Sequence, residues 1–311
     1  MVHVPPHVAV ERRSPTLTPT PGTRLLLAAL RAASAATGVV PRYPQGEAIC
    51  RVAGAAWYVG APAARAAVRD NLRHVLGRRP ARAEIVRVFH HGAFNYWDTF
   101  AIPRFSPAQL LALVDLHGAE HVDRARAAGR GVICASAHLG SVAFVGQVLP
   151  CLGYPTVGLL EPLEPPELYE FFARQRQAHG SRLLPAGPSA VRELLAALRR
   201  NEVLGLVTDR DISGTGPIIP FVGAATRFPD GAAALSVRTG APILIAVAVR
   251  KAGGRFDAWI EPLPPVERTG DTKRDVLELT RAVAGRLGYY VASHPEQWTV
   301  FQRRWPEAQP G

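Results

Sequence analysis

The sequence predicts an α/β fold, in which a mostly parallel central sheet is covered by helices on both faces. From residue 131 onward, short apolar runs rich in β-branched residues alternate with longer stretches of helical period. This alternation is typical of βα units, in which a helix returns the chain to the start of the next parallel strand. With 311 residues, 48% of them hydrophobic, the chain is long and apolar enough to bury a substantial core.

The region before this alternation is expected to be helical. Residues 1–21 are rich in proline and polar residues and predict a disordered leader. Residues 22–305 are expected to form a single domain, with a helical N-terminal part at 22–128, an α/β core at 129–305 and a tail at 306–311. The helices expected before the core are 22–37, 46–60, 62–76, 83–101, a short one from Pro103 to about residue 113, and 119–128.

In the core, the expected strands are the apolar runs Val132–Ala135, Thr156–Leu160, Arg182–Pro185, Val203–Thr208, Ile243–Val249 and Phe256–Ile260. The helices expected between and after them are about 140–150, 165–179, 188–200, 230–239 and 272–293.

One histidine lies where an α/β sheet presents its ligand-binding groups. The strand Val132–Ala135 is followed by small residues, then His138 and Gly140, and the pattern then becomes helical. Ligands of α/β sheets bind at the carboxyl ends of the strands. A histidine there is able to act as a general base on a hydroxyl group, because imidazole exchanges its proton near neutral pH. The alternative is a histidine that only completes a turn.

The charge of the chain predicts an anionic partner. The formal net charge is +11, and Arg65, Arg69 and Arg73 share one face of an expected helix. A membrane surface, an acidic acyl-carrier protein and nucleic acid all fit the charge. Nucleic acid is not expected, because the basic residues do not alternate with stacking aromatics and no nucleic-acid motif occurs.

The cysteines and the hydropathy limit the location. Three scattered cysteines without C-x-x-C spacing favour a reduced cytoplasmic compartment and predict no metal site. The most apolar early stretch, Leu25 to Val40, is interrupted by Arg31 and Gly38 and is shorter than the ~20 residues of a spanning helix. The first helices either pack on the core or lie in a membrane surface.

Further polar residues follow predicted strands. Glu161 ends one strand, and Asp209-Arg210-Asp211 follows another and leads into a glycine-rich loop. Arg176 lies in a basic run on a helix and has the chemistry to bind phosphate or to stabilise an oxyanion. For Glu161 the alternative is an ion pair or a helix cap, for Arg176 a surface role, and for the two aspartates ion pairing and loop shaping.

Several blocks in this chain occur in the order of a known family. They are Asp70-Asn71-Leu72 with Leu76-Gly77, the strand–His138–Gly140 block, Gly158–Leu163, Arg174-Gln175-Arg176 with Gly180, Asp209-Arg210-Asp211 with Gly214, Gly216, Pro220-Phe221 and Gly223, Arg238–Pro242, and His294-Pro295-Glu296-Gln297-Trp298. Together they resemble the lysophospholipid acyltransferase superfamily, in its lipid A and phosphatidylinositol mannoside acyltransferase branch. The resemblance covers about residues 20 to 305 and implies a glycerolipid acyltransferase-like fold.

The resemblance implies an O-acyltransferase that works peripherally at the cytoplasmic face of the inner membrane. A fatty acyl chain would pass from acyl-CoA or acyl-carrier protein to a hydroxyl of a glycolipid or lysophospholipid, with no metal or nucleotide cofactor. His138 would be the general base, and backbone N–H groups near Gly140, or Arg176, would hold the oxyanion. The expected substrate-binding residues are Gly140, Ser141, Glu161, Arg176, Asp209, Arg210 and Asp211.

One residue departs from the pattern of the family. The family has an acid five residues after its histidine, which orients the imidazole, and this chain has Ala143 there. Ser141 is close enough in sequence to bond the ring but carries no charge. Glu161, Asp209 or Asp211 would have to approach from neighbouring strand ends. The alternative function is therefore a catalytically impaired lipid-binding protein of the same fold.

Overall fold

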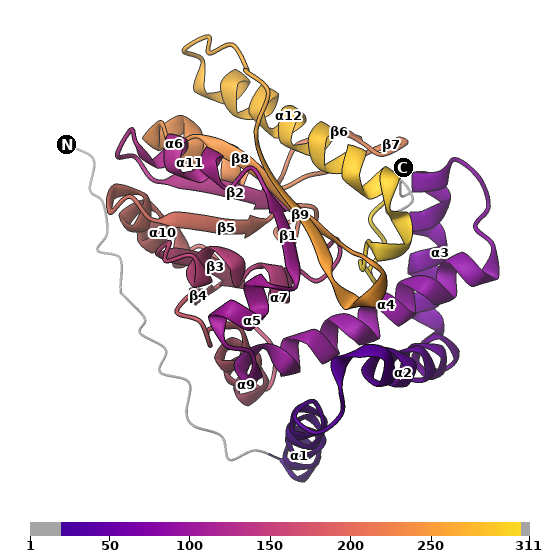
Figure 1. Cartoon of the computed structure of the whole chain (residues 1–311). Helices are drawn as coiled ribbons and strands as arrows, with labels where there is room; N and C mark the ends of the chain where they lie inside the picture. The colour runs from indigo at the N-terminus through magenta and orange to yellow at the C-terminus, as the bar shows by residue number, and fades with distance from the viewer. Residues whose placement is uncertain (1–19, 306–311) are drawn as a thin grey trace, which may run out of the picture.

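The computed structural model of the chain describes residues 20–305 and has a seven-stranded sheet at its centre (Figure 1). The strands are β1 Val114–His117, β2 Val132–Ser136, β3 Thr156–Leu160, β4 Arg182–Pro185, β5 Val203–Val207, β8 Ile243–Arg250 and β9 Phe256–Pro262, in the spatial order β1-β9-β8-β2-β5-β3-β4. Residues 1–19 of the expected leader and the expected tail at 306–311 lie outside the described residues.

The sheet is mostly parallel, as the sequence predicts. Strands β8, β2, β5, β3 and β4 run the same way, and β9 pairs antiparallel with β8. Only residues 251–255 connect β8 to β9, too few for the crossover that parallel neighbours require. Because β2, β5 and β3 are adjacent and parallel, the residues that follow them meet at one edge of the sheet.

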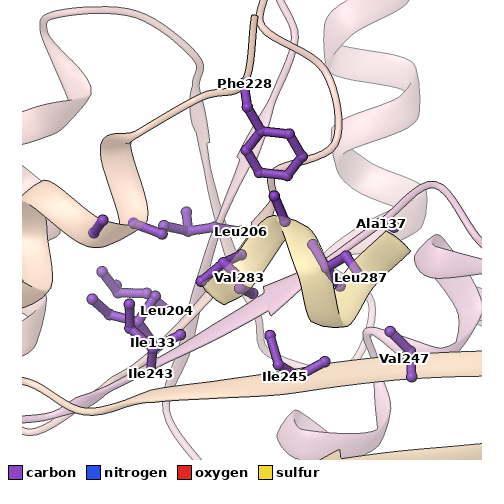
Figure 2. Packing of buried hydrophobic residues seen from close by; sticks show 14 of the residues in the cluster. Ile133, Ala137, Leu204, Leu206, Phe228, Ile243, Ile245, Val247, Val283 and Leu287 are labelled. Carbon is purple, nitrogen blue, oxygen red and sulfur yellow. The ribbon is translucent and has the colours of Figure 1, made fainter. Parts of the chain in front are cut away.

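Helices cover both faces, because side chains along each strand alternate between them. On one face, Ile133 and Ala135 of β2 pack with α10 (Ala190–Arg199), α11 (Gly231–Thr239) and α12 (Thr272–Ser293). Figure 2 shows Val283 and Leu287 of α12 near the strand residues of this layer. On the other face, Val132 and Cys134 pack in a layer with α6 (Glu120–Arg126). Beside it, α5 (Pro107–Leu111), α7 (Val142–Val145) and α8 (Val148–Cys151) cover β1, β8 and β9.

The N-terminal helices lie at one end of the sheet (Figure 1). They are α1 Pro21–Ala36, α2 Glu47–Gly60, α3 Pro62–Leu76 and α4 Arg82–Ala101, close to the predicted ranges. Leu27 of α1 packs with Phe100 of α4 and with Phe171 of α9, the helix Pro166–Arg176. On α3, Arg65 donates a hydrogen bond to the carbonyl of Tyr58.

Four elements differ from the sequence prediction. The helix expected from Pro103 to about residue 113 is a 3-10 turn at Ile102–Arg104 followed by α5, Pro107–Leu111. The expected helix 140–150 is two short helices, because Pro150 has no N–H to donate to the carbonyl four residues before it. Strand β1 was missed, since Val114–His117 contains only two apolar residues and lies at the sheet edge. The hairpin of β6 (Ile218–Phe221) and β7 (Ala224–Arg227), in the region expected to be loop, was missed because Pro220 weakens its strand pattern.

Candidate active site

His138 lies at the carboxyl edge of the sheet, two residues after β2. The chain turns sharply there, and Gly140 has a φ of +59°. A Cβ on Gly140 would collide with the carbonyl oxygen of Ala248 on β8, so this position requires glycine. The turn directs the imidazole away from the core, and 33% of the His138 side chain is exposed. The ring is therefore held by the protein and still open to a substrate.

The carboxylate of Asp209 holds the imidazole. Asp209 follows β5, the strand next to β2, and its side chain is fully buried. Its Oδ1 accepts a hydrogen bond from Nδ1 of His138 at 2.7 Å, and its Oδ2 accepts one from the backbone N–H of His138 at 2.9 Å. One carboxylate thus fixes both the main chain and the ring of His138.

The surroundings of Asp209 keep it ionised. Burial by itself raises the pKa of this carboxyl group, but the charge of His138 and the hydrogen bonds from His138 and Trp298 outweigh burial, so its pKa lies below the ordinary value. A buried carboxylate that stays negative next to an imidazole stabilises the imidazolium form when the ring accepts a proton. The pair therefore has the chemistry of a general base with its orienting acid.

The three acids that the sequence left open have different places. Asp209 reaches the imidazole across the sheet edge. Glu161, after β3, forms an ion pair with Arg210 at 3.2 Å. Asp211 accepts hydrogen bonds from the N–H groups of Ser213, Gly214 and Gly216, and so shapes the loop after β5. The carboxylate missing at Ala143 is therefore supplied by the neighbouring strand.

The structure bears on two expectations about the turn. Ser141 Oγ is buried and has no hydrogen-bond partner within residues 20–305, so it does not bond the ring of His138. The N–H of Gly140 donates to the carbonyl of Gln297 at 3.1 Å, so a role in holding the oxyanion stays a prediction for the other N–H groups near Gly140. The hydroxyl of Ser141 is enclosed by the packing of the turn, and the N–H of Gly140 is engaged by Gln297. Their contact with substrate stays a prediction.

Arg176 is the other oxyanion candidate. It ends α9, and its carbonyl accepts hydrogen bonds from Gln147 at 2.9 Å and Ser181 at 2.8 Å. Its Nε is buried and has no hydrogen-bond partner among the described residues. Burial lowers the pKa of its guanidinium group from the ordinary value. A buried donor without a partner is able to bind an anionic or strongly polar oxygen.

A C-terminal segment forms a second wall of the site, which reasoning from residues missed. The N–H of Thr299 donates to the carbonyl of His138 at 2.9 Å, and Trp298 Nε1 donates to Asp209 Oδ2 at 2.7 Å. Arg304 Nε donates to the carbonyl of Asp209 at 2.6 Å. The only signal in the sequence was the block His294–Trp298, which the resemblance included without a role.

A partly exposed imidazole backed by a buried carboxylate is able to activate a hydroxyl group, which is the step that acyl transfer to an alcohol requires. The fold and the site thus define an acyltransferase-like α/β protein. The sequence profile of the bacterial lipid A biosynthesis acyltransferases matches residues 29–307. The chain belongs to this family, and it is an O-acyltransferase.

Individual relatives agree with this assignment. The chain is 32% identical over 247 residues to a phosphatidylinositol mannoside acyltransferase of Mycobacterium tuberculosis, covering 76% of each chain. It is 31% identical over 244 residues to the protein of the same name from Mycolicibacterium smegmatis, covering 76% of this chain and 78% of the relative. The match spans most of both proteins.

Proposed function

We propose that this protein moves a fatty acyl chain from acyl-CoA or acyl-carrier protein to a hydroxyl group of a membrane glycolipid. The observation that carries the proposal is the pairing of His138 with the buried carboxylate of Asp209. The names of the relatives make phosphatidylinositol mannosides the first class of acceptor to test.

In the proposed reaction, His138 is the general base. Nδ1 of the ring donates to Asp209, which leaves the lone pair of Nε2 to take the proton of the acceptor hydroxyl. The hydroxyl oxygen attacks the thioester carbonyl, and a tetrahedral oxyanion forms. When the carbon–sulfur bond breaks, the imidazolium returns its proton to the thiolate. The products are the new ester and the free thiol, and His138 is neutral again.

Arg176 is the residue that we propose for the oxyanion. The support is its buried Nε, which has no hydrogen-bond partner in residues 20–305. A preorganised donor of this kind stabilises a tetrahedral intermediate by about 3–4 kcal/mol in other acyl-transfer sites. Glu161, Arg210 and Asp211 are proposed to border the acceptor at the same edge of the sheet.

The proposed acceptor is a lipid, so the protein has to meet a membrane surface. None of the helices within residues 20–305 is long and apolar enough to cross a bilayer. On α2, Ile49, Val52 and Val59 lie on one exposed stripe, while Cys50 and Gly54 face α4. Leu25 on α1 is also exposed. We propose that this exposed apolar surface of α1 and α2 rests on an anionic membrane, on its cytoplasmic side.

The alternative, a lipid-binding protein with little catalysis, was motivated by Ala143. The position of Asp209 supports catalysis instead, because it offers the imidazole a carboxylate from the end of another strand. The alternative stays a separate outcome of the test below.

The test of the transfer uses the full chain with radiolabelled palmitoyl-CoA and phosphatidylinositol mannosides in mixed micelles. We expect a labelled product lipid with the native protein and none with His138→Ala. Equal turnover by native protein and His138→Ala contradicts the proposed base. No transfer by the native protein to any hydroxyl lipid, with retained lipid binding, favours the alternative.

The membrane proposal is tested by co-sedimentation with vesicles of phosphatidylglycerol and phosphatidylcholine. Val52→Ser combined with Val59→Ser is expected to reduce binding to the anionic vesicles at least fivefold, because it removes the apolar stripe. The matched control is Val191→Ser with Ile218→Ser, which changes exposed aliphatic residues on α10 and β6. Equal loss in both double variants contradicts the assignment to α2.

A further inference from the structure

The indole of Trp298 belongs to the packing of the core and also touches the acid of the site. The ring is 2% exposed and lies 6.0 Å, between centroids, from both Phe221 and Trp305. Its Nε1 donates to Asp209 Oδ2 at 2.7 Å in a buried hydrogen bond. A tryptophan used only for packing at this place has no need to direct its one polar atom at that carboxylate.

The hydrogen bonds of Asp209 divide between its two oxygens. Among the described residues, Oδ1 accepts only from the ring of His138, whereas Oδ2 accepts from the backbone N–H of His138 and from Trp298. Within residues 20–305, Trp298 is the only residue besides His138 that donates to this carboxylate. The two donors to Oδ2 fix the rotation of the carboxylate, and therefore the direction in which Oδ1 points.

We propose that Trp298 is a positioning residue for the proton transfer of the acyltransferase, acting on His138 through Asp209. Its N–H holds the carboxylate in the one rotation in which Oδ1 faces Nδ1, so that the ring keeps its proton on Nδ1 and presents Nε2 to the acceptor hydroxyl. The N–H also draws negative charge away from the carboxylate, which moderates its hold on the imidazolium. The inference rests on the proposed role of His138 as base.

Other charged groups near the pair are held by contacts that do not involve Trp298. Arg304 Nε donates to the backbone carbonyl of Asp209 at 2.6 Å and not to its carboxylate. The same guanidinium group also donates to Thr226 and to the carbonyl of Arg227. Arg210 is engaged by Glu161, and Asp211 by the backbone of its own loop. A change in pH dependence on removing the indole N–H therefore reports the bond to Asp209.

The experiment compares Trp298→Phe with Trp305→Phe. Both variants lose a buried indole from the same aromatic cluster, but the N–H of Trp305 donates to the carbonyl of Ala224 and has no contact with Asp209. Steady-state transfer from palmitoyl-CoA is measured from pH 5 to 9, together with the melting temperature. If Trp298→Phe does not fold, benzothienylalanine at position 298 keeps the bicyclic shape and replaces the N–H by sulfur.

For Trp298→Phe we expect kcat to fall at least fivefold, with KM within twofold of native. The acidic limb of the kcat/KM profile is expected to move upward by about half a pH unit, because a carboxylate with one fewer donor holds the proton on His138 more firmly. Trp305→Phe is expected to lower the melting temperature by a similar amount and to keep the native profile.

Two results overturn the inference. One is a Trp298→Phe enzyme with native kcat and native pH profile while His138→Ala is inactive, which makes Trp298 a packing residue only. The other is the same loss of kcat and the same pH shift in Trp305→Phe. Retained transfer by His138→Ala contradicts the proposed function itself, so the two failures are told apart.

Discussion

Two fully buried aspartates, Asp209 and Asp98, carry out opposite tasks in this fold. Asp209 lies at the carboxyl edge of the sheet and is bonded by an imidazole, an indole and an amide. Asp98 lies on α4 between two guanidinium groups, with Arg42 Nε at 2.8 Å and Arg250 Nη2 at 2.5 Å. The side chains of Arg42 and Arg250 are 10% and 5% exposed, so this cluster is closed to substrate.

The difference lies in the partner rather than in the acid. Arginine keeps its proton at every pH that a protein tolerates, so the cluster at Asp98 stores no proton and joins segments that are far apart in sequence. The linker before α2 is held by Arg42 and the end of β8 by Arg250. Histidine binds and releases a proton near neutral pH, so the pair at Asp209 is able to cycle. One carboxylate therefore joins distant parts of the fold, and the other has a partner that is able to take part in the proposed proton transfer.

The largest expected effect is on activity, in Asp209→Asn. The NH₂ group of an asparagine at this position would face an N–H donor of His138 or Trp298. The clash is relieved only when the imidazole carries its proton on Nε2, and in that form Nε2 is no longer a base. We expect kcat to fall about a thousandfold or more, as in triads that lose their acid. The control is Asp211→Asn, which changes a residue at the edge of the site that does not contact the ring of His138, and which should keep activity within tenfold. Transfer assays with both variants check this, and comparable losses would contradict the assignment of the acid.

The next effect is on stability, in Asp98→Asn. Removing the carboxylate leaves two buried guanidinium groups without their counter-charge, which costs about 3–5 kcal/mol in buried pairs. Urea denaturation measures the loss in the free energy of unfolding. The matched control is Glu261→Gln, whose partly exposed pair with Arg286 should contribute about 1 kcal/mol or less. Equal losses would contradict the expectation that the buried cluster at Asp98 contributes more to stability than the partly exposed pair.

The pH dependence of stability combines both acids. Burial by itself raises the pKa of Asp98, but the charges and hydrogen bonds of Arg250 and Arg42 outweigh burial. The pKa of both aspartates therefore lies below the ordinary value of 3.8. Each therefore contributes stability that is present above that value and is lost as the pH falls through the lower folded-state pKa.

We expect the free energy of unfolding to decline below about pH 4, by up to about 1.4 kcal/mol per pH unit for each acid. Asp98→Asn should make this decline shallower, because one of the buried carboxyl groups with a lowered pKa is gone. Urea titrations at pH 5, 4 and 3 measure it. An unchanged slope in the variant would show that Asp98 does not titrate in this way.

The smallest effect is expected from Ala143→Glu, which restores the acid of the family pattern. Because Nδ1 of His138 already donates to Asp209, a second carboxylate has no free N–H to orient, and activity should stay within threefold. The new charge enters an apolar layer with Phe144 and Phe105, so we expect a stability loss of about 1 kcal/mol. A rise in kcat of tenfold or more would show that the pair with Asp209 is incomplete without it.

Much of the core followed from local pattern. The runs that became β2, β3, β4, β5, β8 and β9 were apolar enough to predict within two residues at either end, and α12 was predicted at its observed limits. Elements with weak local signals were missed, such as the edge strand β1 and the hairpin β6–β7. Their pairing is decided by neighbours that are far away in the chain, and hydrophobic period does not report those neighbours.

By itself, the sequence determined that His138 follows a buried strand, that Gly140 allows the turn after it, and that three acids follow other strands of the core. Only the tertiary structure decided which acid reaches the ring, because that depends on β2 lying next to β5. The same holds for Trp298, which reaches Asp209 from 89 residues further along the chain, and for Thr299, which reaches His138 from 161 residues further along. Local chemistry is set by the order of residues, but the distance between two side chains is set by how strands pair and pack.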